Sequence, residues 1–354
     1  MPSSISSSNA NERLPQGQWL ATWLITLILV ISITLGWEVY CRTIGFTPAG
    51  VADTPELWQQ TRKRASVLGH DAVILVGASR SQLGINTEVM SRYTPSHPIQ
   101  LAIDGSFFMP VLENLAADNS ITGTIIVDLE IEKIPAQLTN ARTQELIQFY
   151  EKYQSNNPHG LIQPIEDFLQ NQINRWFAFR VTGANPQTLL TRALSGDSDP
   201  MGTDYLLTLP DRSRQADYQK VAQPEVYLSR LQRNLGNDTL DKINPVQWPT
   251  FDTDMQYLET LVQRIERRGG KVIFVRFPTD KGIWQIDEAR YPRQQFWDKL
   301  ASMTSATSIH FKDYPSLSRF ELPDGSHLDY RDAIPFTEAL SRLIFPTTLS
   351  KNDK

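Results

Sequence analysis

The sequence has a single cysteine, Cys41, among its 354 residues. One thiol excludes a disulfide framework within the chain and a cysteine-rich metal site. The sequence also lacks an excess of positive charge, because its 34 Lys and Arg residues face 39 Asp and Glu residues and give a formal net charge of −5. That balance lacks the basic footprint of nucleic-acid-binding proteins, so we expect no nucleic-acid partner.

The motifs of nucleotide and metal sites are missing too. Residues 77–84 follow an apolar run but contain neither the glycine fingerprint of dinucleotide-binding folds nor the lysine of a phosphate-binding loop. Asp128, Glu130 and Glu132 lie close together, but no histidine joins them and nearby arginines can neutralise them. We therefore expect no cofactor and no metal ion.

One long apolar run is present, near the amino terminus. From Leu14 to Trp37 there is no charged residue, and this length suffices for a membrane-spanning helix of about 17–25 residues. Aromatic residues cluster toward both ends of the run, as they do at membrane interfaces. No small-residue cleavage site follows. We expect an uncleaved transmembrane anchor at 18–40, preceded by a disordered cytoplasmic tail at 1–17.

Apolar runs and helical stretches alternate in the remaining chain. The alternation predicts right-handed strand–helix–strand units, and hence an α/β fold with a parallel five-stranded sheet covered on both faces, over residues 54–345. The expected strands are 72–76, 98–103, 124–129, 271–275 and 308–311, and the expected helices include 54–68, 110–117, one from about 252, and 331–344.

Residues 134–251 interrupt this alternation, because they contain no clear strand signal. A structureless loop of that length is improbable in a compact domain. We expect a large, mostly helical insertion that lies near the carboxyl edge of the sheet.

The sequence contains a serine, a histidine and an aspartate that could act together in catalysis. Ser79 follows the first buried strand, at the edge where open α/β sheets keep their sites. A serine nucleophile requires an imidazole to take its proton and a carboxylate to orient that imidazole. His327, with Asp324 three residues before it, can supply both groups. Gly105, after the second strand, offers an unhindered amide for an oxyanion.

The turn from Gly77 to Ser81, the glycine after the second strand, and the segment Asp324-Gly-Ser-His327 together resemble the SGNH (GDSL-type) hydrolases. More narrowly, they are similar to membrane-anchored members linked to acyl modification of cell-surface polymers. The resemblance covers residues 70–130 and 270–345 and implies a three-layer, flavodoxin-like sandwich.

The resemblance also implies roles for single residues. Ser79 would be the nucleophile, His327 the general base and Asp324 its orienting acid, while the amides of Ser79 and Gly105 would contribute to the oxyanion hole.

Two positions depart from the family pattern. Ala78 stands where the family usually has Asp, and the Asn that usually follows the third strand is replaced by the acidic stretch 127–132. Arg276, directly after the fourth strand, is a candidate replacement donor, and it could equally hold a substrate carboxylate. Arg80, beside the serine, is a second candidate for a substrate contact.

The sequence thus leads to two expectations for function. The first is a serine esterase or O-acyltransferase that acts on an acylated cell-envelope glycan through an acyl-Ser79 intermediate. The alternative is a non-catalytic scaffold or binding module of an envelope polysaccharide export or modification complex. In both cases the resemblance implies a single-pass protein of the bacterial inner (plasma) membrane with an extracytoplasmic carboxyl-terminal domain. The partners would be the envelope polysaccharide and a membrane-bound acyl-transfer protein.

Overall fold

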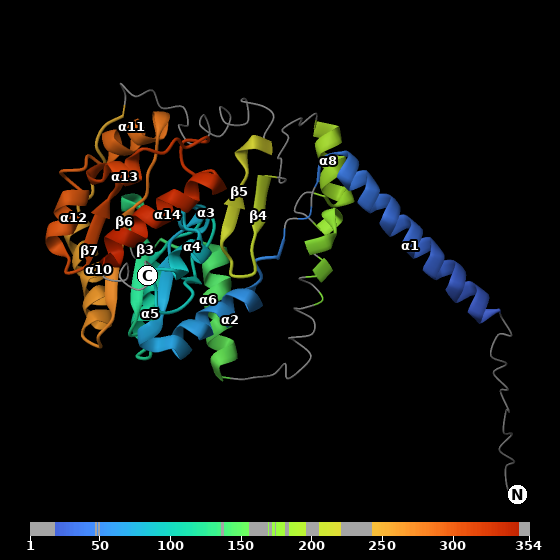
Figure 1. Ribbon diagram of the computed structural model, residues 1–354, viewed down its shortest axis with the longest axis horizontal. Helices are drawn as coiled ribbons and strands as arrows, with labels where there is room; N and C mark the ends of the chain where they lie inside the picture. Colours follow the sequence, from blue (N-terminus) through green and yellow to red (C-terminus); the bar gives the residue numbers. More distant parts are fainter. Residues whose placement is uncertain are drawn as a thin grey trace, which may run out of the picture.

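The computed structural model describes residues 18–46, 48, 50–135, 138–155, 169, 172–173, 175–180, 184–195, 205–220 and 243–346. The tail expected at 1–17 lies outside the described residues. The centre of the molecule is a five-stranded parallel sheet with the order β2-β1-β3-β6-β7 (Figure 1). Its strands are β1 (Val73–Val76), β2 (Ile99–Gln100), β3 (Thr124–Asp128), β6 (Lys271–Arg276) and β7 (Thr307–His310). The predicted α/β fold with a five-stranded parallel sheet is confirmed.

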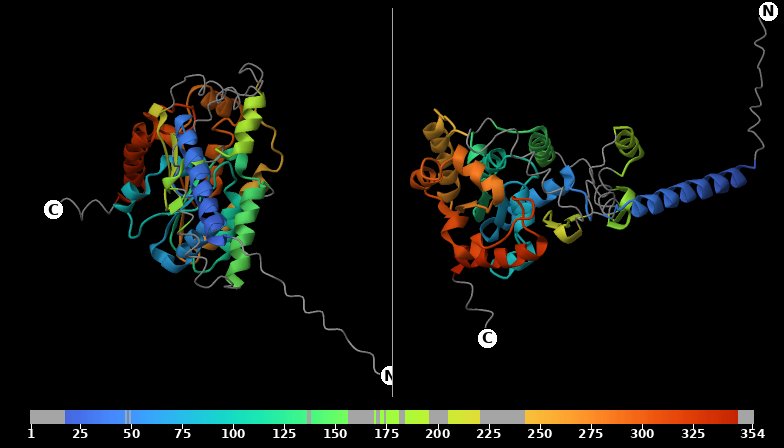
Figure 2. Two further views of the ribbon diagram at one scale, coloured as in Figure 1. Left: turned by 90° about the vertical axis from the view of Figure 1, so that its right-hand side faces the viewer. Right: turned by 90° about the horizontal axis from the view of Figure 1, so that it is seen from above.

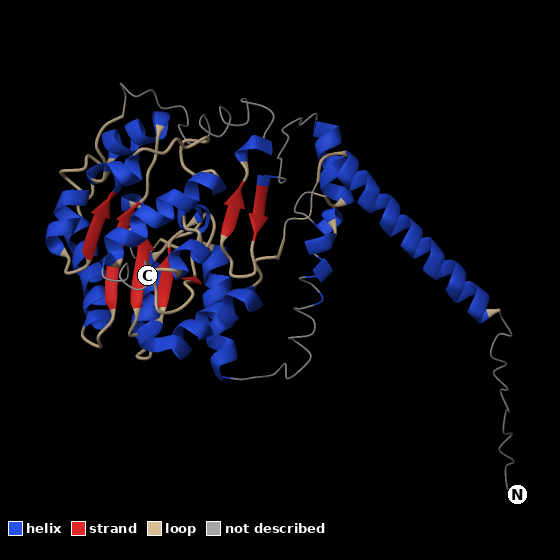
Figure 3. Ribbon diagram, viewed as in Figure 1, coloured by secondary structure: helices blue, strands red, loops and turns tan. Residues whose placement is uncertain are grey.

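Helices cover both faces of this sheet (Figure 3). Side chains alternate along each strand, so Ile125 of β3 packs into one apolar cluster and Ile126 into the other. The helices of this part are α2 (Pro55–Leu68), α3 (Ser79–Gly84), α4 (Thr87–Ser91), α5 (Met109–Ala117), α6 (Ala141–Ser155), α10 (Phe251–Glu266), α11 (Lys281–Arg290), α12 (Trp297–Met303), α13 (Pro315–Ser318) and α14 (Tyr330–Ile344). Helix α8 (Pro186–Ser195) lies away from the sheet (Figure 1). Helices α2, α5 and α10 contribute to the first cluster, and α13 and α14 to the second.

The second strand is shorter than the sequence predicts. Only Ile99 and Gln100 form the β2 ladder, although the apolar run continues to Ile103. The chain nevertheless stays beside β1, because the amide of Ile103 donates to the carbonyl of Gly77 at 3.0 Å. This contact brings the glycine-containing turn after β2 next to the turn after β1.

The insertion contains strands that the sequence pattern does not reveal. Besides α6 and α8, its described part holds an antiparallel hairpin of β4 (Leu206–Thr208) and β5 (Arg214–Ala216), which the sequence analysis did not predict. The hairpin packs on α3 through a cluster that contains Leu83 and Tyr218. In Figure 1 it lies between the sheet and the end of α1 (Trp19–Thr43).

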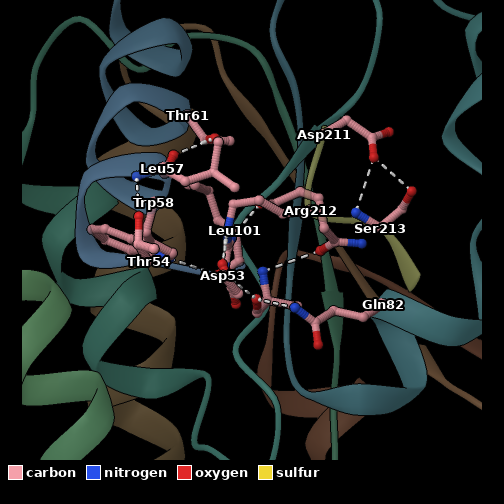
Figure 4. Close-up of polar contacts among 12 residues, drawn as sticks. Asp53, Thr54, Leu57, Trp58, Thr61, Gln82, Leu101, Asp211, Arg212 and Ser213 are labelled. Atoms are coloured by element: carbon pink, nitrogen blue, oxygen red, sulfur yellow. Dashed lines mark hydrogen bonds and ion pairs between the residues drawn. The ribbon is translucent and has the colours of Figure 1, made fainter. Parts of the chain in front are cut away.

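A buried arginine ties the hairpin to the chain that leaves α1 (Figure 4). The Arg212 side chain is fully buried, and its Nε and Nη2 donate to the two carboxylate oxygens of Asp53 at 2.6 and 2.9 Å. The same guanidinium donates to the carbonyls of Gln100 and Ala102, beside β1. A bridge between Gly50 and Thr208 adds a backbone contact. The hairpin is therefore fixed to both the sheet and the linker.

Helix α1 projects away from the α/β domain (Figure 2). It has 25 residues, a mean hydropathy of 2.1 over its most apolar window and no buried residue in that window. Its length and composition suffice to cross a membrane, as predicted for residues 18–40.

Candidate active site at the carboxyl edge of the sheet

The turn after β1 requires glycine at its first position. Gly77 has φ of +143°, and a Cβ built there would lie 2.5 Å from Cβ of Asp128 at the end of β3. The turn leads directly into α3, whose first residue is Ser79. The amide of Ser79 thus lies in the first turn of a helix, where no intrahelical acceptor exists.

The loop before α14 folds back on itself around a carboxylate. Oδ1 of Asp324 accepts hydrogen bonds from the amides of Ser326 at 2.9 Å and His327 at 2.8 Å, and Gly325, between Asp324 and Ser326, has φ of +78°. This geometry directs the imidazole of His327 onto Oδ2 of Asp324, 2.8 Å from Nδ1. The Asp-x-x-His spacing works because both groups share one tight turn.

The serine completes this hydrogen-bond chain. Nε2 of His327 lies 2.8 Å from Oγ of Ser79, which comes from the other end of the sequence. The structure therefore brings together Ser79, His327 and Asp324, the three residues to which the sequence analysis assigned the nucleophile, base and orienting acid.

Asp324 is held in its ionised form. The side chain is only 4% exposed, and although burial opposes ionisation, the charge and hydrogen bond of His327 and the hydroxyl of Tyr218 lower the pKa of this carboxyl well below its ordinary value. An ionised Asp324 accepts a hydrogen bond from Nδ1–H of His327 and so keeps the proton on Nδ1. That tautomer leaves the Nε2 lone pair available to accept the proton of Ser79.

Sequence reasoning missed a fourth member of the chain. The hydroxyl of Tyr218, which opens the 3₁₀ helix η5 (Tyr218–Lys220) after the hairpin, donates to Oδ2 of Asp324 at 2.7 Å. The amide of Tyr218 donates to Asp329 at 2.9 Å, so the insertion is fastened to the His327 loop at two points. No local motif marks Tyr218, since the contact spans 106 residues.

Arg80 links the turn that carries Ser79 to the loop that carries His327. Its Nε donates to Oγ of Ser326 at 3.1 Å, and its Nη1 lies 2.7 Å from Oε2 of Glu130. Burial alone would lower the pKa of this guanidinium, but Glu130 and other carboxylates raise it above the ordinary value. Arg80 is therefore charged and paired with groups of the protein, and its candidate role in a substrate contact stays a prediction.

Asp128 occupies the end of β3, close to the position where the family resemblance leads to an Asn. It is 1% exposed, and neither carboxylate oxygen has a hydrogen-bond partner within the described part of the chain. Burial and the neighbouring Glu130 raise the pKa of Asp128 to about 6. Glu130 takes the charge of the pair: burial opposes it, but Arg80 and Lys133 lower its pKa to about 2.

Gly105 and Arg276, the two remaining predicted site residues, make hydrogen bonds to different parts of the chain. The carbonyl of Gly105 accepts from Nδ2 of Asn140 at 3.1 Å, which fixes the turn after β2 to the start of the insertion. Nη2 of Arg276 pairs with Asp287 of α11 at 2.5 Å and also lies within hydrogen-bond distance of Thr279. The structure thus joins Arg276 to α11 through its hydrogen bonds. Its predicted role at an oxyanion stays a prediction.

The residues that the structure describes contain no group of three or more His, Cys, Asp or Glu side chains that could hold a metal ion. No family model matches this chain, and no curated protein matches it significantly.

Proposed function

We propose that this protein is a membrane-anchored serine hydrolase or acyltransferase of the SGNH type, which carries an acyl group on Ser79. The observation that supports the proposal is the continuous hydrogen-bond chain from Ser79 through His327 to Asp324, with both links at 2.8 Å. A serine, an imidazole and an ionised carboxylate in this order are the components of nucleophilic acyl transfer.

The proposed reaction has two halves. Oγ of Ser79 attacks the carbonyl carbon of an acyl ester while Nε2 of His327 takes the hydroxyl proton, and the amides of Ser79 and Gly105 face the developing oxyanion. The bond to the leaving alcohol then breaks as His327 returns the proton to it. In the second half, water or a sugar hydroxyl attacks the acyl-Ser79 ester with His327 again as base.

The proposed substrate is an acylated cell-envelope glycan. In this proposal α1 spans the inner membrane and holds the α/β domain on the extracytoplasmic side. Water as acceptor makes the protein an esterase, and a sugar hydroxyl makes it an O-acyltransferase that receives its acyl group from a membrane-bound partner.

One observation favours a non-catalytic scaffold instead. Asp128, an acidic side chain, stands near the position where the resemblance expects an amide donor, and an ionised carboxylate cannot donate to an oxyanion. The scaffold would keep the fold and bind the polymer without turning it over.

Labelling with a fluorophosphonate probe separates these two functions. The detergent-solubilised full chain should react at Ser79, and Ser79→Ala and His327→Ala should both abolish labelling. Ser81→Ala is the matched control, because Ser81 is a buried serine in the same short helix, and it should label like the wild type. A folded wild-type protein that stays unlabelled, also toward a small activated ester, would favour the scaffold.

A further inference from the structure

Part of the insertion exposes large apolar side chains. Five of them occur between residues 169 and 194, and their exposed fractions range from 37% to 80%. They are Leu169, Ile173, Trp176, Leu190 and Leu194. Isolated exposed apolar residues are normal on a protein surface, but several within one short segment indicate an interaction site.

The spacing of these residues places them on helix faces. Leu169, Ile173 and Trp176 each have helical backbone, and their spacing of four and three residues in the sequence is that of one face of a helix. Leu190 and Leu194 are four residues apart on α8. Leu189, one position earlier, packs inward against the cluster around Cys41. Each helical stretch therefore turns one apolar face away from the protein.

This segment docks on the end of the apolar helix α1. The carboxylate of Glu38 accepts the amides of Ala178 and Phe179 at 3.0 and 3.1 Å. The guanidinium of Arg42 donates to the carbonyl of Trp176 at 2.8 Å. Glu38 and Arg42 lie in the last two turns of α1, so the exposed apolar faces lie beside the point where the chain would leave a bilayer.

The positive charge of the segment also favours a location at a membrane surface. Residues 168–195 contain Arg175, Arg180 and Arg192 but no Asp or Glu, in a chain whose net charge is −5. Arginines next to an aromatic and leucine-rich face are typical of helices that lie in the interface of a membrane with anionic lipids.

We propose that the surface formed by Leu169, Ile173, Trp176, Leu190 and Leu194 is a second membrane contact, which lies in the headgroup region of an anionic bilayer beside the anchor. Its continuity with α1 and its positive charge favour lipid over a second copy of this acidic chain. The contact would hold the insertion, and with it the hairpin and Tyr218 that follows the hairpin, against the membrane surface. The inference does not depend on the chemistry of Ser79.

Depth-dependent quenching tests the proposal on the full chain in nanodiscs of phosphatidylcholine and phosphatidylglycerol. Cys41, the single cysteine, is first replaced by Ala, and an environment-sensitive nitrobenzoxadiazole probe is attached at Leu194→Cys. Val67→Cys on α2 is the matched control, because Val67 is 76% exposed and Leu194 is 80% exposed. Leu27→Cys, within α1, reports separately whether the anchor has inserted.

We expect a doxyl group on the lipid acyl chains to reduce fluorescence at position 194 about twofold, as for a site buried a few ångströms into the headgroup boundary, and to leave position 67 unchanged. Equal fluorescence at 194 and 67, with position 27 quenched, would overturn the proposal while leaving the anchor intact. A blue shift at 194 that grows with protein concentration and resists lipid quenching would also overturn it, because a second copy would then cover the face.

Discussion

Replacing Asp324 by Asn tests how the site controls the proton on His327. Four donors converge on this carboxylate: two amides on Oδ1, and the His327 imidazole and the Tyr218 hydroxyl on Oδ2. Asn offers one carbonyl oxygen and one NH₂ group, so two of the four donors must face another donor. If the backbone amides keep the carbonyl oxygen, the NH₂ group faces Nδ1 of His327. The imidazole then carries its proton on Nε2 and cannot accept the proton of Ser79.

We expect Asp324→Asn to slow fluorophosphonate labelling by about 10⁴-fold, the effect of the wrong tautomer in a Ser-His-Asp triad. This factor corresponds to about 5.5 kcal/mol of transition-state stabilisation. Stopped-flow or gel-based labelling rates at several pH values would measure it.

The same variant has a defined effect on stability. Because the folded pKa of Asp324 is lowered, its ionised form stabilises the protein above the ordinary Asp value of about 4, and this contribution is lost as the pH falls below that value. Asp324→Asn should therefore lower the melting temperature at neutral pH and flatten its decrease in acid.

Asp118→Asn is the matched control. Although burial opposes the shift, hydrogen bonds from Ser120 and Ser66 lower the pKa of Asp118 to about 2, and the residue follows α5 at the opposite edge of the sheet. This variant should lose the stabilising contribution of the ionised carboxylate at neutral pH, but it should react with the fluorophosphonate probe at the wild-type rate. Labelling of Asp324→Asn within about tenfold of the wild type, or ~1.4 kcal/mol, would refute the proposed role of Asp324.

Two further predictions concern the residues around this chain. Tyr218→Phe removes the hydrogen bond that helps to hold the carboxylate of Asp324 against His327. We expect labelling to slow by about tenfold, with Tyr205→Phe as the control. A labelling rate equal to that of the wild type would contradict the argument. Asp128→Asn should raise the free energy of unfolding at neutral pH by roughly 1–3 kcal/mol. The pKa of Asp128 is about 6 in the folded protein, against an ordinary value near 4. Ionisation of this carboxyl therefore opposes folding more and more as the pH rises from about 4 to about 6. Thermal melting near pH 7 and near pH 4 measures this gain, which should shrink in acid; an equal gain at both would show that the ionisation of Asp128 is not its cause.

The sheet could be predicted because β1, β3 and β6 each contain a short, continuous apolar run. Burial on both faces leaves little choice of residue in parallel strands such as β1 and β6. The hairpin could not be predicted, because β4 and β5 have three residues each and most of their side chains are half-buried. Such strands are held by the Arg212 contacts and by packing on α3, neither of which leaves a local pattern.

The candidate site divides along the same line. Asp324 and His327 share one turn, so their spacing in the sequence already places them together. Tyr218 and Arg80 act through partners that are 106 and 246 residues away, and only the folded chain shows these contacts. The sequence shows that several carboxylates lie near Asp128. Which of Asp128 and Glu130 keeps its proton depends on the positions of Arg80 and Lys133, which only the folded chain shows.

The ion pair between Asp53 and Arg212 determines where the chain can be cut to obtain a water-soluble domain. A truncation that starts at α2 keeps every strand of the sheet but removes Asp53, and it leaves the fully buried guanidinium of Arg212 without its carboxylate. Breaking a buried pair in this way costs about 3–5 kcal/mol. A truncation that starts at or before Gly50 retains both this pair and the bridge to Thr208. The shortest unit that keeps the candidate site and all its supporting contacts intact therefore begins in the linker, not at the first helix of the domain.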